Sequence, residues 1–265
     1  AVSAGGALHA GWLTDFAARM PSIDERMAAG KALRDKVPHD AHAEYRPAAA
    51  RGDPVTVLEE QAKSRLPSLV PIRYARMLAN PFAFLRGSAA VMAADLAGTP
   101  VTGLSVQACG DAHLANFGVF ASAERNLVFG INDFDETLPG PWEWDLKRLA
   151  ASIVVAGHFL GADASSCKDA AHAAVRSYRK HMRDYARMSH LDVWYSRIGE
   201  KCILDAISAG ARGDVQRTMA KARRRNHLHV LGKMAELVDD QHHIVEDEAL
   251  VGREPRQVIP DQRAA

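Results

Sequence analysis

Two short acidic loops, each following a segment of β character, constrain this chain more than any other feature. The first loop reads GDAHLAN over residues 110–116, and the second reads NDFDET over residues 132–137. Alternating apolar and polar residues predict strands at 103–109, 116–121 and 126–131. The last two strands are joined by Ser-Ala-Glu-Arg, which is typical of a hairpin loop. Both acidic loops therefore follow strands of one small sheet.

Helical periodicity dominates the rest of the sequence. The predicted helices cover residues 55–66, 71–78, 89–96, 145–160, 163–188, 199–209 and 214–238. The predicted N-caps are Asp53, Ser88, Asp163 and Asp214, while Asn80-Pro81 is interpreted as a break. The expected fold class is α+β, mainly α, with a small antiparallel sheet. We expect a helical or extended segment at 1–53, a catalytic lobe at 54–250 and a flexible tail at 251–265, the expected point of truncation.

The charge balance limits the expected classes of partner, and the cysteine content indicates the expected cellular location. The chain has 33 basic and 32 acidic residues, so no global field favours nucleic acid or a membrane. A basic run at Lys221 and 223–225 is predicted to be a solvated helix face. The three cysteines include no C-x-x-C pair, and the N-terminal residues lack a signal peptide pattern. A cytoplasmic location is expected.

The spacing of polar residues in the two loops suits phosphoryl transfer. That reaction needs Mg²⁺ held by oxygen ligands and an acceptor hydroxyl held in line with the phosphate. Asp111 and Asn116 have the D-x-x-x-x-N spacing that places a catalytic carboxylate and an amide ligand in one loop. Asp133 follows the third strand, where a second carboxylate would complete the metal site. The pattern predicts a site for phosphate and metal.

These residues also carry a resemblance to known enzymes. CGDAHLANFGVF resembles the catalytic loop of aminoglycoside and choline phosphotransferases, and GINDFDE resembles their metal-binding segment. The resemblance implies the large, C-terminal lobe of a protein-kinase-like fold. It implies that Asp111 is catalytic, that His113 shapes the loop, that Asn116 and Asp133 bind Mg²⁺, and that Asp145 braces the loop backbone.

A longer stretch resembles one bacterial family closely. Three segments carry this resemblance: LVPIRYARMLANPFAFLRGSAAVMAADLAGTP, GDAHLANFGVFAS and INDFDETLPGPWEWDLKRLAAS. The chain is similar over about residues 25–250 to the family catalogued as domain of unknown function 2252. Longer members of that family carry a glycine-rich strand and a V-K-E-A-like segment beyond the point that matches Ala265. The resemblance implies a circularly permuted kinase-like fold with its nucleotide-binding lobe at the C-terminus.

Two departures from the phosphotransferase pattern bear on activity. Cys109 stands where the motif has histidine, so the loop must be braced differently. No glycine-rich phosphate loop or V-A-I-K-like lysine strand precedes the catalytic loop. The nucleotide-binding lobe is therefore expected to be missing from these 265 residues, which would weaken ATP binding.

Several side chains keep two interpretations. His113 is a candidate catalytic residue, although its motif position favours a structural role. Asp135 is either a further metal ligand or a solvated carboxylate. Arg86 either holds an anion of the cofactor at a helix start or is a surface arginine. Cys109 lacks the partners of a catalytic triad, so a cysteine nucleophile is not favoured.

The expected function is an ATP- and Mg²⁺-dependent phosphotransferase acting on a small-molecule or protein hydroxyl. One alternative is a non-catalytic, pseudokinase-like module that binds a partner or ligand. Another is a nucleotidyl transferase that uses the same metal ligands. The sequence identifies neither the acceptor nor which group is transferred.

Overall fold

The computed structural model describes residues 21–47, 51–224, 235–238, 241–244 and 258–259, and these form two compact units. The first unit, residues 1–44, contains helix α2 (Ile23–Lys36) and the 3-10 helix η1 (His39–His42). Helix α2 begins at a capping box, in which Ser22 accepts from the Glu25 N–H and the Glu25 carboxylate accepts from the Ser22 N–H. The second unit, residues 45–265, contains the remaining elements.

Short helices open the second unit. They are α3 (Pro54–Ala62), η2 (Pro67–Leu69), α4 (Val70–Met77), α5 (Pro81–Gly87) and α6 (Ala89–Leu96). Asp53 caps α3 and Asn80 caps α5, each followed by proline at the first helical position. Helices α4 and α5 pack tightly, because a Cβ atom on Gly87 would lie 2.5 Å from Met77 Cγ. This packing brings the side chains of α4 and the end of α5 to one surface.

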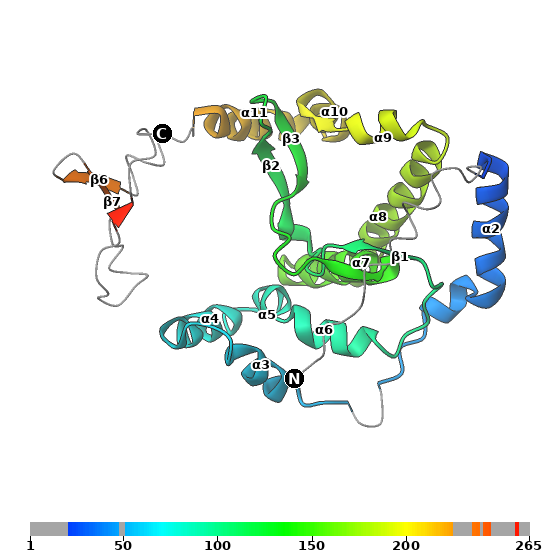
Figure 1. Ribbon diagram of the computed structural model, residues 1–265, viewed down its shortest axis with the longest axis horizontal. Coiled ribbons are helices and arrows are strands. Elements are labelled where there is room, and N and C mark those ends of the chain that lie inside the picture. The colour runs from blue at the N-terminus through cyan, green and yellow to red at the C-terminus, as the bar shows by residue number, and fades with distance from the viewer. Residues whose placement is uncertain (1–20, 48–50, 225–234, 239–240, 245–257, 260–265) are drawn as a thin grey trace, which may run out of the picture. The chain divides into compact units, whose positions relative to one another are not determined.

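Two long helices form the centre of the second unit (Figure 1). Helix α7 (Trp142–Phe159) packs against α8 (Ala164–Tyr185), where Gly157 comes close to Cys167. Asp163 caps α8, as the sequence predicts. Helix α7 also contacts α5 and strand β1, so it connects the short helices with the sheet that follows them. Its buried residues include Arg148 and Ser152, which face the site described below.

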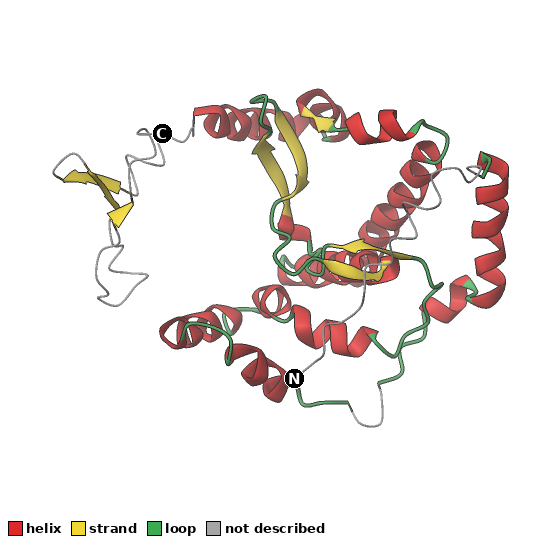
Figure 2. Cartoon of the chain, in the orientation of Figure 1, coloured by secondary structure: helices red, strands yellow, loops and turns green. Residues whose placement is uncertain are grey.

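The sequence predicts one small sheet, but the strands of the described residues form three small antiparallel sheets, and the strands before the two acidic loops lie in different ones (Figure 2). Strand β1 (Ser105–Ala108) pairs with β4 (Leu138–Pro141). Strands β2 (Phe117–Ala121) and β3 (Leu127–Ile131) form the predicted hairpin, with Phe117 opposite Ile131 and Ala121 opposite Leu127. The 3-10 turn η3 (Leu114–Asn116) precedes β2. The hairpin register brings the end of the first acidic loop beside the start of the second.

The remaining described elements follow α8. They are α9 (His190–Tyr195), β5 (Ile198–Gly199), α10 (Glu200–Ala206), α11 (Ala209–Arg224), β6 (Ala235–Val238), β7 (Gln241–Ile244) and β8 (Val258–Ile259). Strand β5 adds to the free edge of β3, while β6, β7 and β8 pair with one another. In the predicted tail 251–265, only residues 258–259 are described.

The α+β, mainly helical class is confirmed, but several local predictions are wrong. Asn80-Pro81 starts α5 instead of breaking a helix, because the Asn80 side chain accepts from the Ala83 N–H. Asp214 lies inside α11 and does not cap it, and the helix predicted over 214–238 gives way to strand β6 at residues 235–238. Ser88 stands at the N-cap of α6, but its hydroxyl donates to the Leu85 carbonyl.

Strands β4 to β8 are absent from the sequence-based prediction, and β4 is the one that pairs with β1. Strand β4 contains Pro139 and Pro141, and proline is usually taken as evidence against a strand. Here β4 pairs only with β1, so the prolines face no second hydrogen-bonding partner. Within the described residues, no helix combines the length and the apolar character needed to cross a membrane.

Candidate functional site

The first acidic loop is fixed to α7 by Asp145. The Asp145 carboxylate accepts the Cys109 N–H at 2.7 Å and the Gly110 N–H at 3.0 Å. Gly110 has φ +80°, and a Cβ atom there would lie 2.5 Å from the Glu136 carbonyl oxygen. Only glycine combines this backbone conformation with such a close approach. Both acidic loops therefore pack together at Gly110.

Asn116 joins the two loops through its side-chain amide. Its Nδ2 donates to the carbonyl oxygens of Asp111 at 3.0 Å and Asp133 at 2.7 Å, and its Oδ1 accepts the Asp133 N–H at 2.9 Å. The residue is 5 % exposed, so these bonds replace those that water would make. Asn116 thereby sets the spacing between the backbones that carry the two aspartates.

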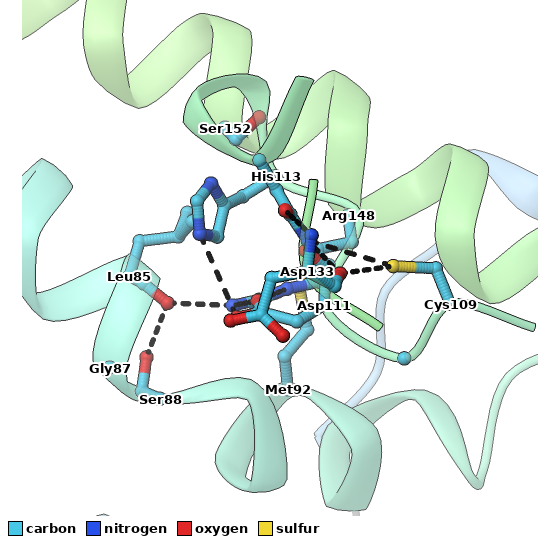
Figure 3. Close-up of polar contacts among 12 residues, drawn as sticks. Leu85, Gly87, Ser88, Met92, Cys109, Asp111, His113, Asp133, Arg148 and Ser152 are labelled. Carbon is cyan, nitrogen blue, oxygen red and sulfur yellow. Dashed lines mark hydrogen bonds and ion pairs between the residues drawn. The ribbon is translucent and has the colours of Figure 1, made fainter. Parts of the chain in front are cut away.

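Asp111 forms an ion pair with an arginine that the sequence analysis did not single out. Arg148 is 2 % exposed, and its Nε donates to Asp111 Oδ1 at 2.6 Å. Its Nη2 also contacts Asp111 and donates to the Leu85 carbonyl of α5 at 2.9 Å (Figure 3). Burial raises the pKa of Asp111, although Arg148 acts in the opposite direction. Asp111 is thus a partly desolvated carboxylate with one oxygen fixed by Arg148.

His113 faces the other oxygen of Asp111. Its Nε2 lies 3.7 Å from Asp111 Oδ2, while its Nδ1 is buried without a hydrogen-bond partner in the described residues. Burial, followed by the charges of Arg148 and Arg86, lowers the pKa of His113 to about 4. The imidazole is therefore neutral at physiological pH.

A pocket of about 800 Å³ opens beside these groups. Its polar lining includes the side chains of Asp111, His113 and Asp133. Its other lining residues come from α4, α5 and the segment before α4: Arg65, Leu66, Leu69, Ile72, Arg73, Arg76, Met77, Ala83, Arg86 and Gly87. The two aspartates from separate loops thus reach one cavity, and Arg86 lies in the same lining. Asn116, Asp135 and Asp145 are not among its lining residues.

The polar groups fit a magnesium ion that brings phosphate ligands of its own. Asp133 is exposed, and one of its oxygens accepts the Asp135 N–H at 3.2 Å, which leaves the other open. The Asn116 amide oxygen is buried, accepts the Asp133 N–H and keeps one further lone pair. The described residues contain no cluster of three histidine, cysteine or acidic side chains that would form a complete protein cage. Mg²⁺ in nucleotide sites commonly takes one or two carboxylates together with substrate phosphates.

Sequence reasoning singled out the polar residues of the two loops and Arg86, but not Arg65, Arg73, Arg76 or Arg148. Cys109 is buried, its pKa is raised by burial, and its sulfur lies 3.6 Å from the Asp133 carbonyl oxygen. Arg148 has no sequence signal of its own, because its partners Leu85 and Met92 lie 63 and 56 residues away. Arg73 and Arg76 lie on α4, where their spacing gives only a polar helix face.

The chain combines a mainly helical α+β fold with a site of two loops that are tied to one helix and to each other. The family model described as "Uncharacterized protein conserved in bacteria (DUF2252)" matches residues 65–262, and the chain belongs to this family. Searches of the curated proteins and of the solved structures returned no match.

Proposed function

We propose that the chain contributes the catalytic site of a Mg²⁺-dependent phosphotransferase that acts on a hydroxyl group. One observation carries the proposal: Asp111 and Asp133, from separate loops, line a single pocket while Asn116 joins the backbones behind them. Phosphoryl transfer depends on positioning and charge stabilisation, so a rigid pair of carboxylates is the part that the protein must supply.

Asp111 has the environment of a group that accepts the hydroxyl proton. Arg148 fixes one carboxylate oxygen, and the other remains available beside the pocket. In the reaction, the acceptor oxygen bonds to the γ-phosphorus of ATP while the bond from that phosphorus to the bridging oxygen breaks. The hydroxyl proton passes to Asp111, and ADP leaves. The raised pKa of Asp111 makes its carboxylate a better proton acceptor than an exposed aspartate.

Asp133 and Asn116 are the groups that would hold Mg²⁺, with Asp133 as the open carboxylate. When bound, the ion neutralises charge on the phosphates. Asp145 acts on this site only through the backbone of Cys109 and Gly110. His113 is neutral and buried, so its expected role is to orient Asp111 rather than to transfer a proton.

The test compares isosteric substitutions in the protein. Asp111→Asn and Asp133→Asn should each lower Mg²⁺-dependent transfer from ATP by at least ~100-fold, since each removes a charge that acts in the transition state. Asp169→Asn on the exposed face of α8 is the control and should keep wild-type activity. Thermal unfolding of Asp133→Asn and Asp169→Asn should resemble that of the wild type. Asp111→Asn leaves the buried Arg148 without its carboxylate and should unfold at a lower temperature, so all activities are measured well below the lowest unfolding midpoint. Retained activity in either of the first two variants would reject the proposal.

A non-catalytic binding module is the second candidate, and the Asp111–Arg148 ion pair favours it. A carboxylate held by arginine can serve as a structural anchor without accepting a proton. This alternative predicts ligand binding without turnover, and nucleotidyl transfer instead predicts a product heavier by a nucleoside monophosphate. Mass spectrometry of the reaction mixture separates the three outcomes.

A further inference from the structure

Four arginines line the pocket opposite its two aspartates. We call Arg65, Arg73, Arg76 and Arg86 the arginine wall. Arg73 and Arg76 come from α4, Arg86 comes from the last turn of α5, and Arg65 precedes η2. The tight packing of Gly87 on Met77 holds α4 and α5 together, so these side chains share one lining.

The arginine wall carries more positive charge than the described residues around it neutralise. In the described part of the chain, none of its four members forms an ion pair with a carboxylate. Arg51 behaves differently, because it pairs with Asp95 through bonds of 2.6 and 2.8 Å. The acidic residues in the pocket lining are Asp111 and Asp133, and Asp111 is already paired with Arg148, while Glu136 acts on Arg73 only through its charge. The pocket therefore has an excess of positive charge.

Arg73 shows that part of this charge is held in place. Its Nη2 donates to Gln61 Oε1 at 3.1 Å and to the Gly87 carbonyl, while its Nη1 is buried without a partner in the described residues. Burial, together with the neighbouring charge of Arg65, lowers the pKa of Arg73. A buried donor without a partner and two like charges side by side are both unfavourable in the empty protein. An anionic ligand would relieve both.

The guanidinium groups of the arginine wall and the apolar side chains beside them indicate which kind of anion would bind there. Guanidinium groups match the oxygens of phosphate in paired, charge-assisted hydrogen bonds, and several arginines suit an anion with more than one charge. The same lining carries apolar side chains from Leu66, Leu69 and Ile72, which can contact the body of a small molecule. The charge of Arg86 acts on both Asp111 and His113, so the anion would bind close to the catalytic carboxylate.

We propose that the arginine wall binds the phosphate groups of a small-molecule ligand beside Asp111. The phosphate belongs either to a phosphorylated acceptor or to the nucleotide, and the recognition chemistry is the same for both. The importance of this site for substrate choice rests on the proposed phosphotransferase function. Phosphate binding itself does not depend on that function, because the arginine wall and its charge are present whether or not Asp111 accepts a proton.

The first experiment measures pyrophosphate binding by isothermal titration calorimetry in the presence of a metal chelator. The wild-type chain should bind pyrophosphate, and Arg76→Gln/Arg86→Gln should weaken binding at least ~10-fold, since each substitution removes charge-assisted hydrogen bonds. Both side chains are exposed and make no polar bond within the described residues, so the fold should be retained. Circular dichroism melting checks this directly.

A second basic cluster provides the matched control. Arg179 and Arg183 lie on α8 in a surface depression with Arg176, Lys180 and Arg187, away from the lining described above. Arg179→Gln/Arg183→Gln makes the same change in net charge, and pyrophosphate affinity should change less than ~2-fold. Equal losses in the two double variants, or no pyrophosphate binding by the wild type, would overturn the proposal.

The source of the phosphate is identified by titrating ATP and glucose 6-phosphate separately. If Arg76→Gln/Arg86→Gln weakens ATP binding, the wall holds the nucleotide phosphates. If it weakens glucose 6-phosphate binding and leaves ATP binding unchanged, the wall holds the acceptor. Because no turnover is involved, failure of the phosphotransferase test with Asp111→Asn would leave these results intact.

Discussion

At the scale of single residues, Arg148 is the one with the largest expected effect on stability and on the site. Its guanidinium contacts the Asp111 carboxylate, the Leu85 carbonyl and the Met92 sulfur, so it connects the first acidic loop to α5 and α6. Removing one member of a buried ion pair leaves an uncompensated charge, which costs far more than the pair itself contributes. The identity of Arg148 therefore bears on folding as well as on the site.

We predict that Arg148→Met lowers the free energy of unfolding by about 3–5 kcal/mol. Asp111→Asn/Arg148→Met should recover part of this loss, because it leaves no unpaired carboxylate. Arg51→Met is the matched control; its exposed ion pair with Asp95 is screened by solvent and should contribute far less to stability. Denaturant unfolding gives all three values. Equal losses for Arg148→Met and Arg51→Met would contradict the prediction.

The sequence predicted the polar residues of the two loops because each lies at a recognisable position in a short motif. Asp111 and Asn116 are five residues apart, and their bonds run within one loop and to its neighbour. Arg86 was a candidate from its place in the sequence, but Arg148 and the other members of the arginine wall were missed for a physical reason. Their surroundings are created by α4 packing on α5 and by α5 and α6 packing on α7, and no local pattern encodes that packing.

At the scale of elements, a turn with a left-handed glycine determines how the two acidic loops meet. Gly103 and Gly110 share a similar backbone, with φ of +87° and +80°. Nothing lies within 4 Å of a Cβ on Gly103, whereas a Cβ on Gly110 would meet the Glu136 carbonyl oxygen. The two positions therefore separate the cost of the backbone conformation from the cost of the close contact.

We predict that Gly103→Ala costs about 1–2 kcal/mol of unfolding free energy, and that Gly110→Ala costs more. The additional cost arises because the backbone at Glu136 must move. Only Gly110→Ala should also weaken the binding of pyrophosphate or nucleotide. The reason is that it disturbs the backbone N–H groups that donate to the Asp145 carboxylate. Thermal unfolding and calorimetry measure the two effects. Indistinguishable unfolding curves for the variants would show that the contact is unimportant.

Elements were predicted best where the sequence pattern was local and regular. The hairpin of β2 and β3 and helix α6 were predicted within one residue of their observed bounds. Helix α5 was missed because Asn-Pro was interpreted as a break, although the same pair makes a good helix start. Strand β4 was missed because its pairing with β1 depends on partners 30 to 36 residues away.

At the scale of the whole molecule, the site belongs entirely to the second compact unit, residues 45–265. Arg148 of α7 binds both the Asp111 carboxylate and the Leu85 carbonyl of α5, so it ties Asp111 to these two helices. The free energy of unfolding of this unit depends on pH through the protonation of its buried groups. Among its buried groups, His113 has a pKa lowered to about 4, and it therefore resists protonation in the folded state.

We predict that the free energy of unfolding falls as the pH is lowered from about 6.5 to about 4. In this range the unfolded chain takes up a proton on His113 that the folded chain does not, whereas above it both forms are neutral. The loss attributable to His113 should approach about 3 kcal/mol at the acid end. Urea unfolding at several pH values should show a shallower slope for His113→Gln. The exposed His172→Gln should keep the wild-type slope, and an unchanged slope in His113→Gln would refute the assignment.

The side-chain amide of Asn116 joins the two acidic loops. The arrangement of both loops therefore depends on one residue and on the codon that specifies it. A one-base transition converts asparagine to aspartate, which keeps the size of the side chain but removes the two donated hydrogen bonds to Asp111 and Asp133. The new carboxylate would also face the backbone oxygens that the amide now binds. Such a change would leave the helices intact while separating the loops. We therefore expect natural relatives that have lost the chemistry but kept the fold to be found first among those with a replacement at position 116.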